Sequence, residues 1–301
     1  MRNTFINTLC ELAEVNKDIF LVCGDLGFSV LEPFASRFPD RFLNAGIAEQ
    51  NMTAVAAGLA LEGYNVFTYS IGNFPTLRCL EHIRYDVAYH QANVKIIAVG
   101  AGYAYGPQGV SHHTTEDIAA LRSIPGMIIG SPADPTEASL MAHFMSRYQG
   151  PGYVRLNKTG EPAIYVNDSQ PVIEPGRFSP IREGINTLVL STGAITHSIL
   201  KELESQNRNW ALSSAPFIGN YDRKLLLELC QMYPDIVTVE EHQSNGGFGS
   251  SVVEAISDLY AARELATMPR VRRIAIPNKF IGTSGSQEYL RMQAGLSLAT
   301  L

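Results

Sequence analysis

The most informative part of this chain is Asn44-Ala-Gly-Ile-Ala-Glu-Gln-Asn-Met-Thr-Ala-Val-Ala-Ala-Gly-Leu-Ala60. It places one carboxylate, Glu49, near the start of a run of small apolar residues that we expect to be helical over 48–61. A carboxyl group that loses water in such surroundings has its pKa raised, so it can hold a proton and hydrogen-bond a basic heterocyclic nitrogen. The alternative is an acid that only complements the helix dipole. We favour a buried acid that acts on a flat nitrogen heterocycle.

Outward from this stretch, short β-branched runs alternate with amphipathic or Ala-rich segments, which is typical of an α/β fold with a mainly parallel sheet. We expect strands over 19–23, 65–69, 94–99, 127–130 and 153–156. We expect helices over 4–15, 48–61, 77–89, 115–121 and 135–147. Asp134 lies directly before Pro135 and is placed to cap the last of these helices.

A turn-rich segment that begins at Asn167 has no sustained hydrophobic period, so we expect a linker over 167–184. The alternation then resumes at 187–190, with a helix through 200, segments 210–212, 222–229 and 236–240, a helix after 249, and a segment 271–276. The sequence therefore predicts two three-layer α/β domains, a first over 1–166 and a second over 185–301.

The composition excludes several classes of protein. A hydrophobic fraction of 46% and a charged fraction of 17% in 301 residues are ordinary for a soluble globular protein. The net charge of -6, without a Lys/Arg-rich run, argues against a nucleic-acid partner. No apolar run approaches the roughly 18 residues of a membrane span, and the first residues lack the core of a signal peptide. We therefore expect a cytoplasmic protein with no membrane partner.

The four cysteines are scattered along the chain without a CxxC pair or the spacing of metal ligands: Cys10, Cys23, Cys79 and Cys230. Such a pattern indicates free thiols, most simply small core residues, rather than disulfides or a zinc site.

Six stretches together resemble a known family. Four of them fall in the order and spacing of the pyrimidine-binding domain of transketolases: Gly46-Ile-Ala-Glu-Gln50, Gly106-Pro-Gln-Gly-Val-Ser-His-His113, Ser131-Pro-Ala-Asp134 and Gly150-Pro-Gly-Tyr-Val-Arg-Leu-Asn-Lys158. Two later stretches resemble the C-terminal domain of transketolase and of deoxyxylulose-phosphate synthase: Glu240-Glu-His-Gln-Ser-Asn-Gly-Gly-Phe-Gly249 and Pro277-Asn-Lys-Phe-Ile-Gly-Thr-Ser-Gly285. The resemblance covers essentially the whole chain.

This resemblance implies thiamine diphosphate as the cofactor and a missing partner chain. Thiamine enzymes of the family hold the diphosphate through Mg²⁺ on a Gly-Asp-Gly motif followed by Asn, which supplies hard oxygen ligands to a hard cation. The nearest string here is Gly24-Asp25-Leu26, with Leu where Gly is required. The chain looks like the C-terminal half of a split transketolase, and we expect no metal ligands in it. A separate N-terminal subunit would supply the diphosphate and magnesium site, in a heterotetramer with two copies of each chain.

The resemblance also implies roles for individual residues. Glu49 matches the glutamate that hydrogen-bonds the aminopyrimidine nitrogen, and Phe74 lies near the position of an aromatic ring against the same heterocycle. His112 matches the histidine that reaches hydroxyls of the donor sugar, where an imidazole can both donate and accept protons. His113 follows it in a Gly-rich loop and is a second candidate for contact with the substrate.

Departures from the family pattern concern the sugar more than the cofactor. Lys158 replaces a phosphate-binding arginine, and Arg2 lies where another such arginine often lies, although both could be solvated surface charges. Gln108 stands where the family has an aspartate that contacts a sugar hydroxyl. Gly100 falls where the family has a phosphate-contacting histidine, and Cys23 lies near the position of a phosphate-contacting serine. We therefore expect sugar or sugar-phosphate substrates, with room for a less phosphorylated or modified sugar.

The favoured hypothesis is a two-subunit transketolase that moves a two-carbon ketol unit from a ketose to an aldose, with Glu49 and His112 as its catalytic residues. Two alternatives stay open. One is the beta subunit of a 2-oxoacid dehydrogenase, which is also a separate chain of two such domains. The other is a non-catalytic paralogue kept for assembly or regulation, which the exchanges at Gln108 and Lys158 leave possible.

Overall fold

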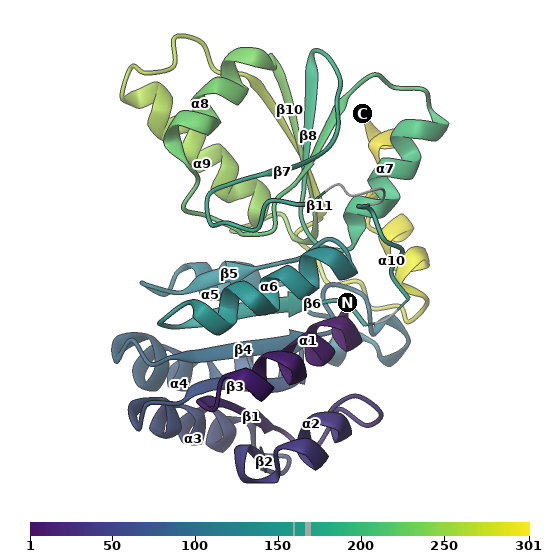
Figure 1. The fold of residues 1–301 in the computed structure, drawn as a ribbon. Coiled ribbons are helices and arrows are strands. Elements are labelled where there is room, and N and C mark those ends of the chain that lie inside the picture. Colours follow the sequence, from purple (N-terminus) through teal and green to yellow (C-terminus); the bar gives the residue numbers. More distant parts are fainter. Residues whose placement is uncertain (159, 166–169) are drawn as a thin grey trace.

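A computed structural model of the protein describes residues 1–158, 160–165 and 170–301, and it shows two α/β domains stacked one on the other (Figure 1). The first domain contains a six-stranded sheet in the order β2-β1-β3-β4-β6-β5, and every pair of neighbours is parallel. Its strands are β1 (Ile19–Cys23), β2 (Phe42–Asn44), β3 (Asn65–Ile71), β4 (Val94–Val99), β5 (Ile128–Gly130) and β6 (Gly152–Leu156).

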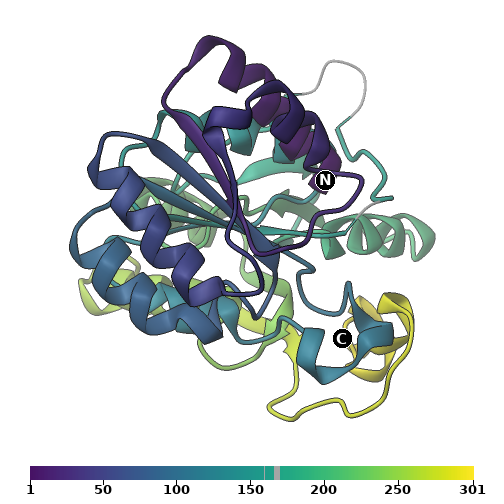
Figure 2. The ribbon, with the colours of Figure 1, turned by 90° about the horizontal axis from the view of Figure 1, so that it is seen from below.

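Helices cover both faces of this sheet, as Figures 1 and 2 show. One face packs against α1 (Arg2–Val15), α2 (Glu32–Arg37) and α6 (Pro135–Arg147). The other face packs against α3 (Glu49–Leu61), the helical run of η2 (Leu77–Cys79), α4 (Leu80–His82) and η3 (Ile83–Tyr89), and α5 (Asp117–Arg122). The strands are mostly apolar on both sides, and β4 is buried at every position, Lys95 included. The result is a three-layer domain.

The second domain has a five-stranded sheet in the order β11-β10-β8-β9-β7, in which only the edge strand β7 is antiparallel. Its strands are β7 (Ser179–Arg182), β8 (Thr187–Ser191), β9 (Ala211–Ser214), β10 (Asp235–Gln243) and β11 (Arg270–Ile276). One face packs against α8 (Arg223–Met232) and α9 (Phe248–Ala261), the other against α7 (Ile195–Ser205) and α10 (Gln287–Gln293).

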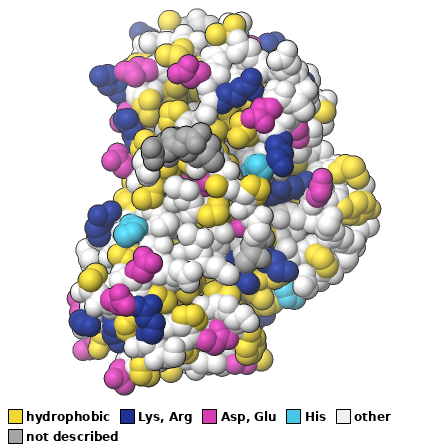
Figure 3. All heavy atoms as spheres, turned by 45° about the vertical axis from the view of Figure 1, so that its right-hand side comes forward, with side chains coloured by type: hydrophobic (Ala, Val, Ile, Leu, Met, Phe, Trp, Pro, Cys, Tyr) yellow, Lys and Arg dark blue, Asp and Glu magenta, His cyan; other side chains and the backbone are white. Residues whose placement is uncertain are grey.

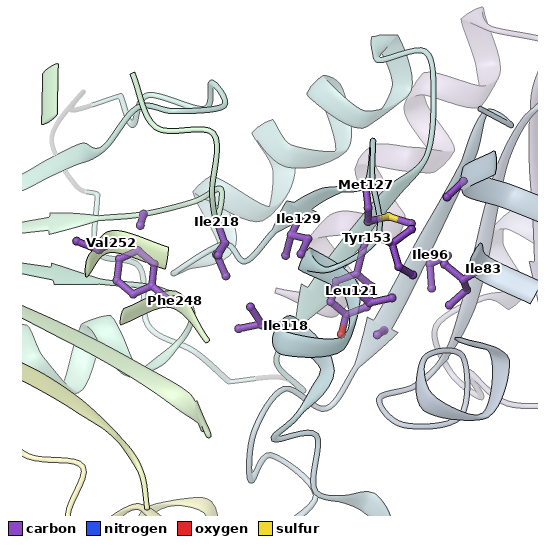
Figure 4. Close-up of a cluster of buried hydrophobic side chains, with 14 of the residues drawn as sticks. Ile83, Ile96, Ile118, Leu121, Met127, Ile129, Tyr153, Ile218, Phe248 and Val252 are labelled. Atoms are coloured by element: carbon purple, nitrogen blue, oxygen red, sulfur yellow. The ribbon is translucent and has the colours of Figure 1, made fainter. Parts of the chain in front are cut away.

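The two domains share apolar core (Figure 4). Ile118 of α5 and Ile129 of β5, both in the first domain, belong to the same buried cluster as Ile218, Phe248 and Val252 of the second. Burial of such side chains contributes roughly 1.5–3 kcal/mol each. This shared core therefore stabilises the contact between the two sheets.

The α/β fold with its two sheets is as predicted, and so is the Asp134 cap, because the Asp134 carboxylate accepts a hydrogen bond of 2.8 Å from the Glu137 amide. The pattern did not predict β2 or β7. The strand β7 lies inside the segment expected to be a linker, where Pro180 and the turn-forming residues give no strand pattern. Residues 167–169 of that segment lie outside the described residues. The domain boundaries stay a prediction. Residues 77–89 are helical as expected, but the last seven form a π-helix.

The surface and the helices add two observations. Among the described residues, no helix combines the length and the apolar character needed to cross a bilayer. On the face drawn in Figure 3, basic and acidic side chains are mixed.

Candidate active site

The candidate residues gather at one edge of the six-stranded sheet. The strand β2 leads into α3, whose first residue is Glu49; Phe74 follows β3, and His112 lies on the loop after β4. Because all these strands are parallel, their carboxyl ends lie on one edge, and the loops that follow them lie near one another there. The topology thus brings together three residues that are far apart in sequence.

Glu49 is buried, with 2% of its side chain exposed, and it is paired. Nη1 of Arg78 donates a hydrogen bond of 2.6 Å to Oε2 of Glu49. The surroundings of Glu49 are therefore not limited to the small apolar residues of its own segment, since a guanidinium from another loop contacts its carboxylate. Gly24, after β1, lies against this acid: a Cβ atom at Gly24 would lie 3.4 Å from Cγ of Glu49.

Phe74 lies next to both Arg78 and His112. The Cζ atom of Arg78 lies 4.7 Å from the centroid of the Phe74 ring. The ring of His112 meets Phe74 edge-on, with centroids 5.3 Å apart, and a further ring, Tyr105, lies 6.3 Å from His112. Glu49, Arg78, Phe74, His112 and Tyr105 therefore form one continuous row of contacts.

The geometry fits a flat nitrogen heterocycle. The planar guanidinium of Arg78 makes one charge-assisted hydrogen bond to Glu49 and lies near the ring of Phe74. A heterocycle with a nitrogen donor would fit the same two contacts. A hollow beside it is lined by Ile47, Ala48, Glu49, Gln50, Asn51, Ala54, Arg78 and His82.

The two neighbouring histidines differ in environment. His112 is half-buried, and its Nδ1 lies 3.0 Å from Oγ of Ser111. His113 is 3% exposed, packs its ring edge-on against Tyr103 and brings Nε2 to 3.4 Å from the carbonyl oxygen of Gly106. Burial lowers the pKa of the His113 ring below its ordinary value. These contacts indicate that His113 supports the loop. Its contact with substrate stays a prediction.

Other predicted residues lie around this row. Lys158 is exposed and its Nζ lies 5.2 Å from the centroid of the Tyr105 ring, which places a cation near His112. Gln108 is exposed on the loop, one turn before His112. Arg2 is at the start of α1 and lies beside Tyr69, whose pKa burial raises while Arg2 acts to lower it. The neighbour of Arg2 is therefore Tyr69, which is not one of the rings in the row from Glu49 to Tyr105.

The sequence analysis missed Arg78 and Tyr105. Arg78 contacts Glu49 and Tyr105 contacts His112, and the Arg78 contact joins separate loops. No local pattern predicts such contacts, although Arg78 follows Phe74 by only four residues.

The described residues contain no group of three or more His, Cys, Asp or Glu side chains placed to hold a metal ion. Asp25, in the string nearest to the metal-binding motif, exchanges hydrogen bonds with Asn44: its carboxylate accepts from Nδ2 at 2.9 Å and its amide donates to Oδ1 at 3.0 Å.

Comparison with known proteins agrees with this architecture. Residues 1–161 match the transketolase pyrimidine-binding domain, and residues 176–301 match the transketolase C-terminal domain. The chain is 35% identical to one of the subunits of the apulose-4-phosphate transketolase of Phocaeicola vulgatus, over 95% of this chain and 90% of that protein. It is 29% identical to the SqwH subunit of the 6-deoxy-6-sulfo-D-fructose transketolase of a Clostridium species, over 99% of this chain and 90% of that protein.

A solved structure described as a split gene transketolase, inactive beta4 tetramer, superposes with a TM-score of 0.83 at 32% identity, covering 98% of this chain and 93% of that one. The two matched domains, the relatives described as subunits and this solved structure all indicate the same family. The chain therefore belongs to the transketolase family, as the C-terminal chain of a split transferase of that family.

Proposed function

We propose that this chain forms the pyrimidine half of a thiamine diphosphate site, and that the complete enzyme moves a two-carbon ketol unit from a ketose to an aldose. The observation that carries the proposal is the row from Glu49 to His112, in which a buried carboxylate and an aromatic ring flank one planar cation. When bound, thiamine diphosphate supplies a nucleophilic carbon that attacks the donor carbonyl.

Glu49 is the residue that we assign to the cofactor's aminopyrimidine ring. Its carboxyl group holds or passes the proton at the ring nitrogen, and its burial excludes water from that exchange. Phe74 orients the flat ring by contact with its face. For this arrangement to form, the guanidinium of Arg78 has to give up its place beside Glu49.

His112 is the residue that we assign to the substrate. The contact of Nδ1 with Ser111 leaves Nε2 as the nitrogen that exchanges a proton with a sugar hydroxyl. The ring contact with Phe74 holds His112 near the place that we assign to the cofactor's ring. Proximity of donor, cofactor and base is the main contribution of this loop to the rate.

A separate N-terminal subunit completes the proposed site with the diphosphate and Mg²⁺ ligands. The solved relative described as an inactive tetramer of beta chains supports this dependence on a partner. We propose a heterotetramer of two chains of each kind, acting in carbohydrate metabolism in the cytoplasm.

The substrates that we propose are sugars or sugar phosphates, including modified ones. Lys158 offers a single point charge in place of an arginine fork, and Gln108 offers an amide in place of a carboxylate. The names of the relatives support this choice, since they concern apulose-4-phosphate and 6-deoxy-6-sulfo-D-fructose.

The decisive experiment combines this chain with its N-terminal partner and measures binding of thiamine diphosphate and Mg²⁺ by calorimetry, with each chain alone as control. We expect binding only in the mixture, followed by cleavage of ketoses and loss of turnover in Glu49→Ala. Decarboxylation of a 2-oxoacid instead would identify the dehydrogenase alternative. Cofactor binding without turnover on a broad panel of sugars would identify the non-catalytic one.

A further inference from the structure

The loop that presents His112 is held at its base by the second domain. Its neck is closed by two backbone hydrogen bonds of 2.9 Å, from Gly102 N to Thr114 O and from Thr114 N to Gly102 O. Directly after the neck, the Tyr103 amide donates a hydrogen bond of 2.7 Å to Oε1 of Glu241, which lies on β10. A carboxylate of one domain thus fixes the first residue of a loop that belongs to the other.

Glu241 is itself held in one position. It is 4% exposed, and Nε of Arg291 donates a hydrogen bond of 2.7 Å to its Oε2. Nε2 of Gln287 lies 3.0 Å from Oε1 and 3.1 Å from Oε2. A buried carboxylate with a guanidinium and an amide on it has little freedom, because leaving any of these donors unpaired is costly.

The neck touches this carboxylate without intervening space. Gly102 has a φ of +58°, and a Cβ atom there would lie 2.4 Å from Cγ of Glu241. Arg155, which is buried on β6, donates from Nη2 to Thr114 O at 2.6 Å and to Glu241 O at 2.9 Å. Both strands of the neck are therefore fixed to the backbone and side chain of the same residue.

The contacts continue from the neck to His112. The ring of Tyr103 packs edge-on against His113, whose Nε2 lies 3.4 Å from the Gly106 carbonyl oxygen. The same carbonyl accepts a hydrogen bond of 3.4 Å from Gly285 N of the second domain. Because His112 precedes His113 directly, we expect a shift of the Tyr103 amide to move both rings.

We propose that Glu241 is a positioning residue that sets the place of His112 next to Phe74. The second domain thus contributes to the reaction by holding this loop. The effect of the placement of His112 on turnover rests on the proposed function. The mechanical link from Glu241 to the two histidines does not, and it can be tested on this chain alone.

The test compares Glu241→Ala and Glu241→Gln with a matched control, Glu202→Ala. Glu202 is also a carboxylate of the second domain and accepts hydrogen bonds from Leu298 N at 2.7 Å and Ser297 Oγ at 2.9 Å, which tie down the end of the chain and not the loop. The measurement is the proton–carbon NMR spectrum of the histidine rings, assigned with His112→Gln and His113→Gln variants.

We expect the ring signals of His112 and His113 to shift or broaden in Glu241→Ala. They should stay closer to wild type in Glu241→Gln, which keeps an oxygen for the Tyr103 amide, and unchanged in Glu202→Ala. Unchanged signals in a folded Glu241→Ala variant would overturn the proposal, and so would equal shifts in the Glu202→Ala control.

The assembled enzyme provides the second readout. In the reconstituted pair we expect Glu241→Ala to lower kcat about tenfold to 100-fold, the scale of a misplaced catalytic group, with partial rescue by Glu241→Gln. Affinity for thiamine diphosphate should stay the same, because Glu49 and Phe74 lie on other loops. A fall in cofactor affinity that accounts for the lost rate would contradict positioning. A wild-type pair without activity on sugars would instead refute the proposed function and leave the NMR result to decide the link.

Discussion

Arg78 and Glu49 form an unequal ion pair, in which the guanidinium is 46% exposed while the carboxylate that it contacts at 2.6 Å is 2% exposed. The arginine covers the acid from the solvent side. Any ligand that is to reach Glu49 from solution therefore has to displace a partly hydrated cation rather than open the core.

The Arg78→Ala variant is expected to lower the free energy of unfolding by about 1–2 kcal/mol, less than for a fully buried pair because one partner is hydrated. The reason is that Glu49 stays buried without a counter-charge. Urea denaturation of the isolated chain measures the change. Arg84→Ala is the matched control, since Arg84 is an exposed arginine over the Tyr85 ring on the same helical run. Equal stability of the two variants would show that the pair contributes little.

The Glu49→Gln variant is expected to lower kcat of the reconstituted pair by roughly 10²–10⁴, the usual loss when a general acid–base group is removed. The amide has the same shape but does not exchange the proton at the cofactor's ring nitrogen. Steady-state turnover is the measurement, with the melting temperature of each variant as the check on folding. Glu62→Gln, at the exposed end of α3, serves as control and should be silent. Near-normal turnover of Glu49→Gln would remove this residue from the mechanism.

Lys95 predicts a pH dependence of stability. It is fully buried on β4, where Nζ donates to the Gly150 carbonyl oxygen at 2.7 Å, and desolvation lowers its pKa to about 7. Between pH 7 and about 10 the unfolded chain binds more protons at this site than the folded chain, so stability rises with pH there, by at most about 1.4 kcal/mol per unit. Below pH 7 both states are protonated and the contribution is constant.

The comparison that isolates this effect is the difference in unfolding free energy between wild type and Lys95→Met across pH 6.5–9.5. We expect the difference to change in favour of wild type as the pH rises, and to be flat for Lys17→Met, whose side chain is exposed. A flat difference for Lys95 as well would mean that the amine is charged in the fold over this range.

Asp134 should be the more costly of two helix caps. It is fully buried and accepts hydrogen bonds from Glu137 N and Ile164 N, each at 2.8 Å. Asp134→Ala should cost about 3 kcal/mol, because a cap is lost and a buried amide is left unpaired. Asp222→Ala removes an exposed cap of α8 that accepts from Leu225 N at 2.9 Å, and should cost about 1 kcal/mol. Chemical denaturation of both variants measures the contrast, which disappears if the 164 segment can rearrange.

The sequence predicted the parts of this fold that local patterns determine. The strands β3 and β4 are long β-branched runs, and Asp134 before Pro135 is a capping signal that needs no tertiary information. The strand β2 has three residues, none of them buried, so its pairing with β1 leaves no pattern to read. The strand β7 contains a proline and pairs only at the edge of its sheet, where such a residue is tolerated.

The candidate site divides in the same way. Glu49 and His112 stand out because a charged or titratable residue lies within a run of small ones. Arg78 does not stand out, and Glu241 appears only within the stretch 240–249 without a role of its own. Their partners, Glu49 and Tyr103, lie 29 and 138 residues away. The sequence therefore pointed to residues that are unusual for their neighbours in the chain, and it left out residues whose neighbours come from the fold.

The clamp formed by Arg155 constrains how such chains can be recombined. This guanidinium, from the strand β6 of the first sheet, binds the Asp117 carboxylate at 2.7 Å and also reaches the Glu241 carbonyl of the second domain. A chimera cut between the two sheets would keep this contact only if the β10 backbone of the second parent lies at the same distance from the arginine. We therefore expect exchange of the whole chain to be tolerated better than exchange of one domain.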